Sequence, residues 1–259
     1  MQEIEFSLEG HVGTITLNRP QKLNAMTVSM DREINRLVKE INNDPNIRSV
    51  ILTGAGGRSF SAGSDISNLS EYGGNWDYRN RFDRDEDYAR GIWKIRKPLI
   101  AAIDGYCIGG GLEMACAADI RLCTPNSSFA AGEINHGWHG GSGATQLLTH
   151  LVGSGDASMF LLTGARFDAN YALSIRLVQE ILDASDLLKR AKELAETIAS
   201  KSPIATQKTK FMIRAAHNIP LEFALLVEND SFSYLMMTED AKEGQAAFAE
   251  KRAPNFKGS

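Results

Sequence analysis

The sequence has no apolar run that approaches the roughly 18 consecutive residues needed for a membrane-spanning helix. Its first residues, MQEIEFSLEG, carry carboxylates where a secretory signal would place positive charge followed by an apolar stretch. Both observations argue against a membrane protein and against a secreted one. We therefore expect a cytoplasmic protein that has no membrane partner.

Cysteine is scarce, because the chain has only Cys107, Cys116 and Cys123. Their number is odd, they lie close together in an apolar region, and no two of them have CxxC spacing. Neither a disulfide framework nor a zinc site is therefore indicated. We expect three buried free thiols and no metal site.

Positive charge is not in excess, since 28 lysines and arginines face 32 aspartates and glutamates, for a formal net charge of −4. A nucleic-acid-binding surface would usually show as a basic excess or a basic run. The glycine-rich segments also match no phosphate-binding fingerprint, because they lack GxGxxG spacing and a terminal Gly-Lys-Ser/Thr. No nucleic-acid partner is expected, but an anionic small molecule stays possible because it needs only a local cluster of donors.

What the sequence does contain is an alternation of strand and helix patterns through its first two thirds. Residues 12–17 (VGTITL) alternate in polarity, whereas residues 28–41 carry apolar side chains at helical spacing. Two short apolar runs, at residues 48–53 (RSVILT) and 98–103 (PLIAAI), end at glycine-containing turns. Strands that alternate with helices predict an α/β fold in which parallel strands are joined by crossover helices.

The last third loses the strand patterns from about residue 186 onward and has the pattern of successive helices. These helices are expected at residues 186–201, 203–217 and 220–251. The last helix should break near Thr238, whose hydroxyl is placed to cap a new first turn. We therefore divide the chain into an α/β core, residues 1–185, and a helical region, residues 186–259. Apolar stripes on this region would suit subunit contacts or a folded-back helical layer.

Two loops stand out because small residues follow directly after predicted strands. Residues 58–66 (RSFSAGSDI) follow one apolar run, and residues 105–111 (GYCIGGG) follow the next. Small residues at such positions let the backbone approach a ligand closely, although glycine there can equally serve turns and close packing. The second loop continues into a helix-like apolar segment that carries Glu113 where the pattern predicts burial.

Five segments in the family's order resemble the enoyl-CoA hydratase/isomerase (crotonase) family, and the resemblance covers nearly the whole chain. They are LNRPQKLNAM (residues 17–26), FSAGSDI (60–66), GYCIGGGLEMACAADIRL (105–122), FAAGEINHG (129–137) and EDAKEGQAAFAEKRAPNFKG (239–258). The last segment is most similar to members of the carnitinyl-CoA dehydratase type. The resemblance implies a crotonase (ClpP-like) α/β spiral of ββα units with a C-terminal helical trimerisation region. It also implies a homotrimer or a dimer of trimers.

The resemblance assigns an oxyanion hole to two backbone N–H groups, which map onto Ser64 and Gly110. In the family these groups hold the thioester oxygen of an acyl-CoA. Enolate formation places negative charge on that oxygen, and preorganised amides stabilise it. The dipole of a helix that begins near Gly111 would add to the effect. Ser64 replaces the commoner alanine, which does not matter if only its N–H is used.

Glu113 and Glu133 map onto the two glutamates of the family's hydratases. Adding water to a conjugated double bond needs one group to activate the water and another to deliver a proton to the α-carbon, and paired carboxylates divide that work. The resemblance therefore implies a lyase that interconverts 2-enoyl-CoA plus water and 3-hydroxyacyl-CoA. It needs no cofactor, because coenzyme A is part of the substrate. Structural roles stay open, with Glu113 at a helix start and Glu133 in a salt bridge at a strand end.

Other activities of the fold remain as alternatives. A double-bond isomerase would use Glu133 alone, and a non-catalytic relative would bind RNA or a protein partner. A dehalogenase of the aryl-CoA type is disfavoured, because Gly141 stands where a nucleophilic aspartate would be expected. The acidic net charge and the two retained glutamates weigh against the non-catalytic alternative.

For the coenzyme A portion of an acyl-CoA substrate, the resemblance indicates backbone around Lys22, Leu23 and Ala62. It places Asp65 and Ile66 next to the adenine. The side chain of Lys22 either meets a phosphate or remains a solvated loop lysine. The phosphates are expected to rely on scattered cations, including some from a neighbouring subunit.

The loop after Glu133 departs from the family pattern, because glycine replaces both prolines expected there. His136, Trp138 and His139 in this loop either contact the acyl group or have structural roles. Metal binding by the histidines is not expected, because no carboxylate or third histidine lies nearby at ligand spacing. Residues 71–94 mix aromatic and charged side chains, which in the family cover the acyl pocket but which also suit a solvated surface helix.

Overall fold

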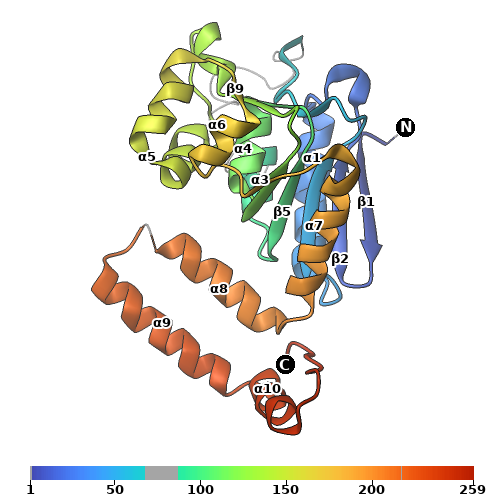
Figure 1. Cartoon of the computed structure of the whole chain (residues 1–259), viewed down its shortest axis with the longest axis vertical. Helices are drawn as coiled ribbons and strands as arrows, with labels where there is room; N and C mark the ends of the chain where they lie inside the picture. The colour runs from blue at the N-terminus through green and yellow to red at the C-terminus, as the bar shows by residue number, and fades with distance from the viewer. Residues whose placement is uncertain (1, 68–86, 217) are drawn as a thin grey trace.

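The computed structural model describes residues 2–67, 87–216 and 218–259. Two sheets and the helices packed on them form an α/β core, and helices from the last part of the chain extend from one end of it (Figure 1). The N-terminus lies beside the edge strand β1, whereas the C-terminus lies beside α10. The predicted α/β class is confirmed.

The larger sheet has the strand order β1-β2-β3-β5-β7-β10. The strands are β1 (Ile4–Glu9), β2 (Val12–Leu17), β3 (Ser49–Gly54), β5 (Leu99–Ile103), β7 (Ile120–Cys123) and β10 (Glu180–Ile181). β1 pairs antiparallel with β2, and the later neighbours pair in parallel. The strands predicted at residues 12–17, 48–53 and 98–103 are confirmed to within one residue as β2, β3 and β5.

Both faces of this sheet are covered, which explains the continuously apolar central strands. In β3, Val50 and Leu52 belong to the main core, which also contains the apolar face of α1 (Val28–Asn43). Ile51, between them in the sequence, packs on the opposite face against α7 (Ala184–Ala199). The run of residues 48–53 therefore lacks polar alternation because each side of the strand meets a helix.

The smaller sheet has the order β4-β6-β8-β9 and very short strands. They are β4 (Ser59–Ser61), β6 (Tyr106–Ile108), β8 (Ser128–Ala130) and β9 (Phe167–Asp168). The chain repeatedly forms one strand in the larger sheet and then one in the smaller, as in β3 and β4, β5 and β6, and β7 and β8. Stacking of these units gives the predicted spiral of ββα units.

The other core helices in the described residues bring the loops of this spiral together. They are α3 (Tyr88–Trp93), α4 (Gly110–Ala117), α5 (Ala144–Thr163) and α6 (Ala169–Ser174). Every residue of α4 is buried, and this helix contacts both α3 and α5. Cys107, Cys116 and Cys123 are buried free thiols, as predicted.

Three further helices follow α7. They are α8 (Pro203–Ala215), α9 (Leu221–Met236) and α10 (Glu239–Glu250). The predicted break at Thr238 is confirmed, because the Thr238 hydroxyl accepts the N–H of Ala241 at 3.1 Å and caps α10. The buried ammonium of Lys210 anchors α8 to the core by a 2.6 Å contact with the Asp119 carboxylate.

Helices α8 and α9 leave large apolar side chains exposed. They include Phe211, Ile213, Leu221, Phe223, Leu226 and Phe232, each more than half exposed. Within the described ranges, no helix combines the length and the apolar character required to cross a membrane.

Candidate active site

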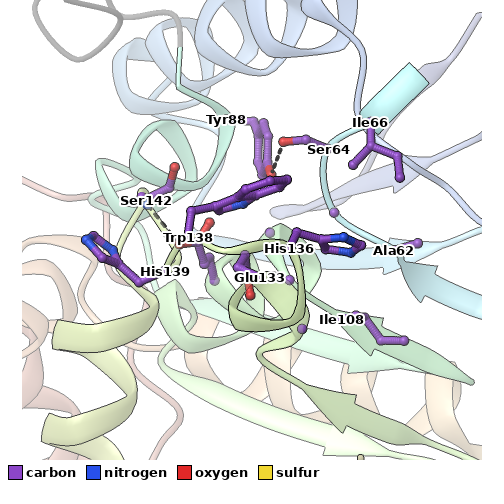
Figure 2. Close-up of a pocket in the computed structure, with 16 residues that line it drawn as sticks. Ala62, Ser64, Ile66, Tyr88, Ile108, Glu133, His136, Trp138, His139 and Ser142 are labelled. Carbon is purple, nitrogen blue, oxygen red and sulfur yellow. Dashed lines mark hydrogen bonds between the residues drawn. The ribbon is translucent and has the colours of Figure 1, made fainter. Parts of the chain in front are cut away.

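A cavity of about 560 Å³ lies where three segments of the core meet (Figure 2). These are the loop after β4, the first turn of α4, and the short helical segment η3 (Gly132–His136). The two small-residue loops predicted at residues 58–66 and 105–111 therefore border one cavity. The four residues predicted to be catalytic all line it, namely Ser64, Gly110, Glu113 and Glu133.

Ser64 and Gly110, the two predicted amide donors, both line this cavity. Met26 fixes the backbone on both sides of Ser64, donating to the Gly63 carbonyl and accepting from the Asp65 amide, each at 2.8 Å. Gly110 begins α4, where the first N–H groups have no carbonyl partner in the helix. Among the described residues, neither the Ser64 amide nor the Gly110 amide donates to a protein acceptor.

Glycine at position 63 lets the two loops approach each other. Its φ is +83°, a conformation that L side chains rarely adopt. A Cβ atom at this position would lie 2.7 Å from the backbone nitrogen of Gly110. The two amides therefore come from backbone segments in direct contact.

Glu113 is a buried carboxyl with two backbone donors. Its Oε1 accepts the N–H of Ser142 at 2.8 Å and the N–H of Ala144 at 3.2 Å. Burial raises the pKa of Glu113 to about 7, because the two donors only partly offset the loss of hydration. The nearby Glu133 carboxyl contributes to this rise in pKa. Both protonation states of Glu113 are therefore populated near neutral pH.

Glu133 lies at the start of η3 and has fewer hydrogen-bond donors around its carboxyl group than Glu113 has. Its Oε2 is buried and has no hydrogen-bond partner among the described residues. Burial raises the pKa of Glu133, while a hydrogen bond from its own backbone and the charges of His136 and His139 oppose the shift. A buried acceptor without a partner is costly, so this oxygen suits a group delivered by a ligand.

The two carboxyl groups converge at Gly140. A Cβ atom at this position would lie 2.8 Å from Oε1 of Glu113, 3.5 Å from Oε1 of Glu133 and 2.5 Å from the Cβ of Ala144. A side chain at position 140 would therefore displace the carboxyl of Glu113. The family pattern predicts proline at this position, but the close packing around Gly140 leaves no room for its ring.

Two of the residues predicted to contact coenzyme A, Ala62 and Ile66, line one rim of the cavity, and the other three adjoin them. Lys22 is exposed at the end of η1 (Pro20–Lys22), and the adjacent Leu23 has a left-handed conformation. The Leu23 carbonyl accepts the N–H of Ala62 and the hydroxyl of Ser59, each at 3.0 Å. Ala62 lines the cavity, so the structure brings Lys22 and Leu23 close to it. Contact with coenzyme A stays a prediction.

Asp65 and Ile66 follow on the same rim. Ile66 lines the cavity and is largely exposed. The Asp65 carboxylate accepts from the hydroxyl of Ser67 and pairs with Arg19 at 2.7 Å, and these bonds lower the pKa of Asp65 to about 2. This carboxylate therefore ties the rim to the start of η1, a contact that the sequence did not indicate.

His136, Trp138 and His139 all line the cavity wall. The rings of His136 and Trp138 are stacked, with centroids 5.3 Å apart (Figure 2 shows both). This placement leaves contact with an acyl group open for all three residues. Among the described residues, no group of three His, Cys, Asp or Glu side chains is arranged to hold a metal ion.

Two residues near the end of the segment at residues 71–94 belong to the site, although no sequence pattern identified them. Residues 71–86 of this segment lie outside the described residues. Tyr88 lines the cavity and is almost completely buried, so the alternative of a solvated surface helix is wrong for α3. Asp87 is also buried and accepts a hydrogen bond from the hydroxyl of Ser142, whose amide holds Glu113.

The sequence model of a family described as enoyl-CoA hydratase/isomerase matches residues 7–259. The chain belongs to the enoyl-CoA hydratase/isomerase family. The family predicted from the sequence is therefore confirmed, and so is the class of enzyme, because named hydratases are among its relatives.

Relatives within the enoyl-CoA hydratase/isomerase family match over nearly their whole length. The chain is 38% identical to the short-chain-enoyl-CoA hydratase of Clostridium acetobutylicum over 245 residues, which cover 94% of this chain and 93% of the relative. It is 35% identical to the (E)-benzylidenesuccinyl-CoA hydratase of Thauera aromatica over 259 residues, which cover 99% of each chain.

The fold comparison agrees with the sequence comparison. The crystal structure of an enoyl-CoA hydratase from Bacillus anthracis matches with a TM-score of 0.92 and 33% sequence identity, and all of both chains is covered. The predicted crotonase fold is thus confirmed.

Proposed function

We propose that the protein adds water to a 2-enoyl-CoA thioester, forming a 3-hydroxyacyl-CoA, or catalyses the reverse dehydration. One observation carries this proposal most directly. Two carboxyl groups with raised pKa values, Glu113 and Glu133, converge in one cavity that is also bordered by the amides of Ser64 and Gly110. The hydratases among its relatives support the same reaction class.

The amides of Ser64 and Gly110 form the proposed oxyanion hole. Water attack at the β-carbon moves negative charge onto the thioester oxygen, giving an enolate intermediate or an enolate-like transition state. Two preorganised N–H donors stabilise this charge, and each donor of this kind contributes about 3–4 kcal/mol in related systems. Gly110 is the first residue of α4, so the positive end of the helix dipole acts at the same place.

The two carboxyl groups divide the acid–base work. In our proposal Glu113 holds and activates the water, and Glu133 exchanges the proton at the α-carbon. A pKa of about 7 suits Glu113 for this work, since a general base is most effective when its pKa lies near the working pH. The buried Oε2 of Glu133 supports its role, because it lacks a protein partner among the described residues.

Coenzyme A would lie along the rim formed by Lys22, Leu23, Ala62, Asp65 and Ile66. In our proposal the exposed ammonium of Lys22 meets a phosphate, whereas the Asp65 carboxylate is already held by Arg19. No cofactor is required apart from the coenzyme A of the substrate. The exposed apolar side chains of α8 and α9 support subunit contacts, and the family resemblance makes a homotrimer or a dimer of trimers the proposed assembly.

The proposal is tested by screening acyl-CoA thioesters by absorbance. Hydration of a 2-enoyl-CoA removes its conjugated chromophore, so absorbance falls. Movement of a 3-enoyl double bond into conjugation makes absorbance rise, which would support the isomerase alternative instead. Absence of both changes across chain lengths and branching patterns would contradict the proposal.

A further inference from the structure

The Tyr88 side chain lies deep in the wall of the cavity, although it comes from a different part of the chain than the two predicted amide donors. Tyr88 is the first residue of α3 and is 2% exposed. Its hydroxyl is 2.9 Å from the hydroxyl of Ser64, the contact drawn as a dashed line in Figure 2. The side chain of one donor residue is therefore held by Tyr88.

The same hydroxyl also packs against the other donor residue. A Cβ atom at Gly110 would lie 1.7 Å from the oxygen of Tyr88 and 2.6 Å from its Cζ. The φ of Gly110 is not in the left-handed region, so close contact with Tyr88, rather than backbone conformation, requires glycine there. Tyr88 thus contacts both residues whose amides would bind the thioester oxygen.

We propose that Tyr88 is a positioning residue that fixes the relative placement of the Ser64 and Gly110 amides, acting through its contacts with both residues. This inference rests on the proposed hydration of enoyl-CoA at the same site. In this view Ser64 is not equivalent to alanine. Its hydroxyl links its own backbone to Tyr88, and the ring and hydroxyl of Tyr88 in turn lie against Gly110.

The chemistry of the tyrosine supports a fixed contact. Burial raises the pKa of Tyr88 well above 10, and the charge of Glu113 raises it further. The hydroxyl therefore keeps its proton over the whole pH range in which an enzyme of this kind works. A neutral hydroxyl that stays in place preorganises the amides without adding a charge that would repel the enolate.

The test is a double-mutant cycle made of Tyr88→Phe, Ser64→Ala and the combined variant. Tyr88→Phe keeps the ring and removes the hydroxyl, whereas Ser64→Ala keeps the amide and removes only the side-chain partner. Tyr171→Phe is the matched control, because it deletes another tyrosine hydroxyl whose partner, Asp156, is 3.0 Å away and outside the cavity. Circular dichroism and thermal melting check that each variant folds.

Two readouts separate positioning from general stability. The first is the split between kcat and KM for a 2-enoyl-CoA that the wild type hydrates. The second is the absorption band of bound 4-(dimethylamino)cinnamoyl-CoA, which moves to longer wavelength as hydrogen bonds polarise its thioester carbonyl. A loss of stability alone would not change the band of the folded, ligand-bound protein.

We expect each single variant to lower kcat about threefold to tenfold, with KM changed less than twofold, and to reduce the red shift of the chromophore. The combined variant should be no worse than the poorer single variant, because both remove the same contact. The Tyr171→Phe control should match the wild type in both readouts.

Two results would overturn the positioning role. One is a Tyr88→Phe effect that persists undiminished in the Ser64→Ala background, since Tyr88 would then act independently of Ser64. The other is an unchanged chromophore band in both single variants. If the wild type itself neither hydrates an enoyl-CoA nor shifts the band, the proposed function fails, and the role of Tyr88 fails with it.

Discussion

At the scale of single residues, Glu113 shows how opposing effects set the chemistry of a carboxyl group. Two backbone N–H donors favour its ionised form, whereas burial and the neighbouring Glu133 favour its neutral form. Burial is the largest effect, so the pKa rises to about 7. A group in this state can accept or release a proton at neutral pH, which an ordinary surface glutamate does poorly.

This raised pKa predicts a pH-dependent gain in stability for Glu113→Gln. The carboxyl has a pKa of about 7 in the folded protein but an ordinary value of 4.5 when unfolded. Stabilisation from the neutral form is therefore complete below pH 4.5 and is lost as pH rises to about 7. Glutamine avoids this loss while keeping an oxygen for the amides of Ser142 and Ala144.

Glu113→Gln should thus be more stable than the wild type at pH 8, by up to about 3 kcal/mol, and the difference should shrink toward pH 5. Urea unfolding at both pH values measures this directly. A stability difference that is the same at the two pH values would show that Glu113 does not titrate in this range.

Residues of the candidate site could be predicted from the sequence only where they belong to a short contiguous motif. Ser64, Gly110, Glu113 and Glu133 stand in short motifs, and all four line the cavity. Tyr88 belongs to no such motif, and its contact with Ser64 could not be predicted because the two residues lie 24 positions apart along the chain. Only the folded backbone brings such contacts together.

At the scale of elements, the segment between η3 and α5 positions a carboxyl that belongs to α4. Gly140 leaves room for Oε1 of Glu113, and the next residues supply the amides that hold it. Gly141 differs, because a Cβ atom there would meet no atom within 4 Å. The two adjacent glycines therefore offer a matched pair of substitutions.

We predict that Gly140→Ala lowers kcat about tenfold or more and costs about 1–3 kcal/mol of stability, because the new methyl group displaces the Glu113 carboxyl and presses on Ala144. Gly141→Ala should have a much smaller effect on stability, because its methyl group would enter open space in the cavity. Steady-state kinetics and urea unfolding of the two variants provide the comparison. Equal losses of stability in the two variants would contradict this account of Gly140.

The longer strands and helices could be predicted from the sequence, whereas the shortest ones could not. The strands β2, β3 and β5 and the helices after residue 186 carry enough residues to show a period or an apolar run. The strands of the smaller sheet have two or three residues each, so no alternation can appear. The segment at residues 71–94 suits either a pocket cover or a solvated helix on sequence grounds, and the six residues of its helix α3 are too few to show an apolar face.

At the scale of the whole molecule, the exposed apolar side chains of α8 and α9 need a partner surface. Leu226 on α9 is 65% exposed and Phe223 on the same helix is 58% exposed. Such apolar concentrations on a folded chain mark protein–protein contacts. The trimer or dimer of trimers that we propose would cover them with other copies of the chain.

Light scattering after gel filtration should therefore give a mass three or six times that of the 28.3 kDa chain. Leu226→Glu should shift the protein toward smaller species, because a charge would be buried in the subunit contact. Leu188→Glu on α7, where the leucine is 52% exposed, is the control and should leave the mass unchanged. A monomeric wild type would contradict the proposed assembly.

The central claim is that the two carboxyl groups have separate duties in water addition. It is tested most directly by measuring wild type, Glu113→Gln and Glu133→Gln with a 2-enoyl-CoA and a 3-enoyl-CoA in the same absorbance assay. We predict that Glu133→Gln loses at least about a hundredfold in every reaction on the thioester. Glu113→Gln should lose hydration by a similar factor and yet retain some movement of the 3-enoyl double bond. Both variants should still bind CoA esters, because the amides of Ser64 and Gly110 are untouched. Hydration by Glu113→Gln at the wild-type rate would contradict the claim and leave Glu113 with a structural role.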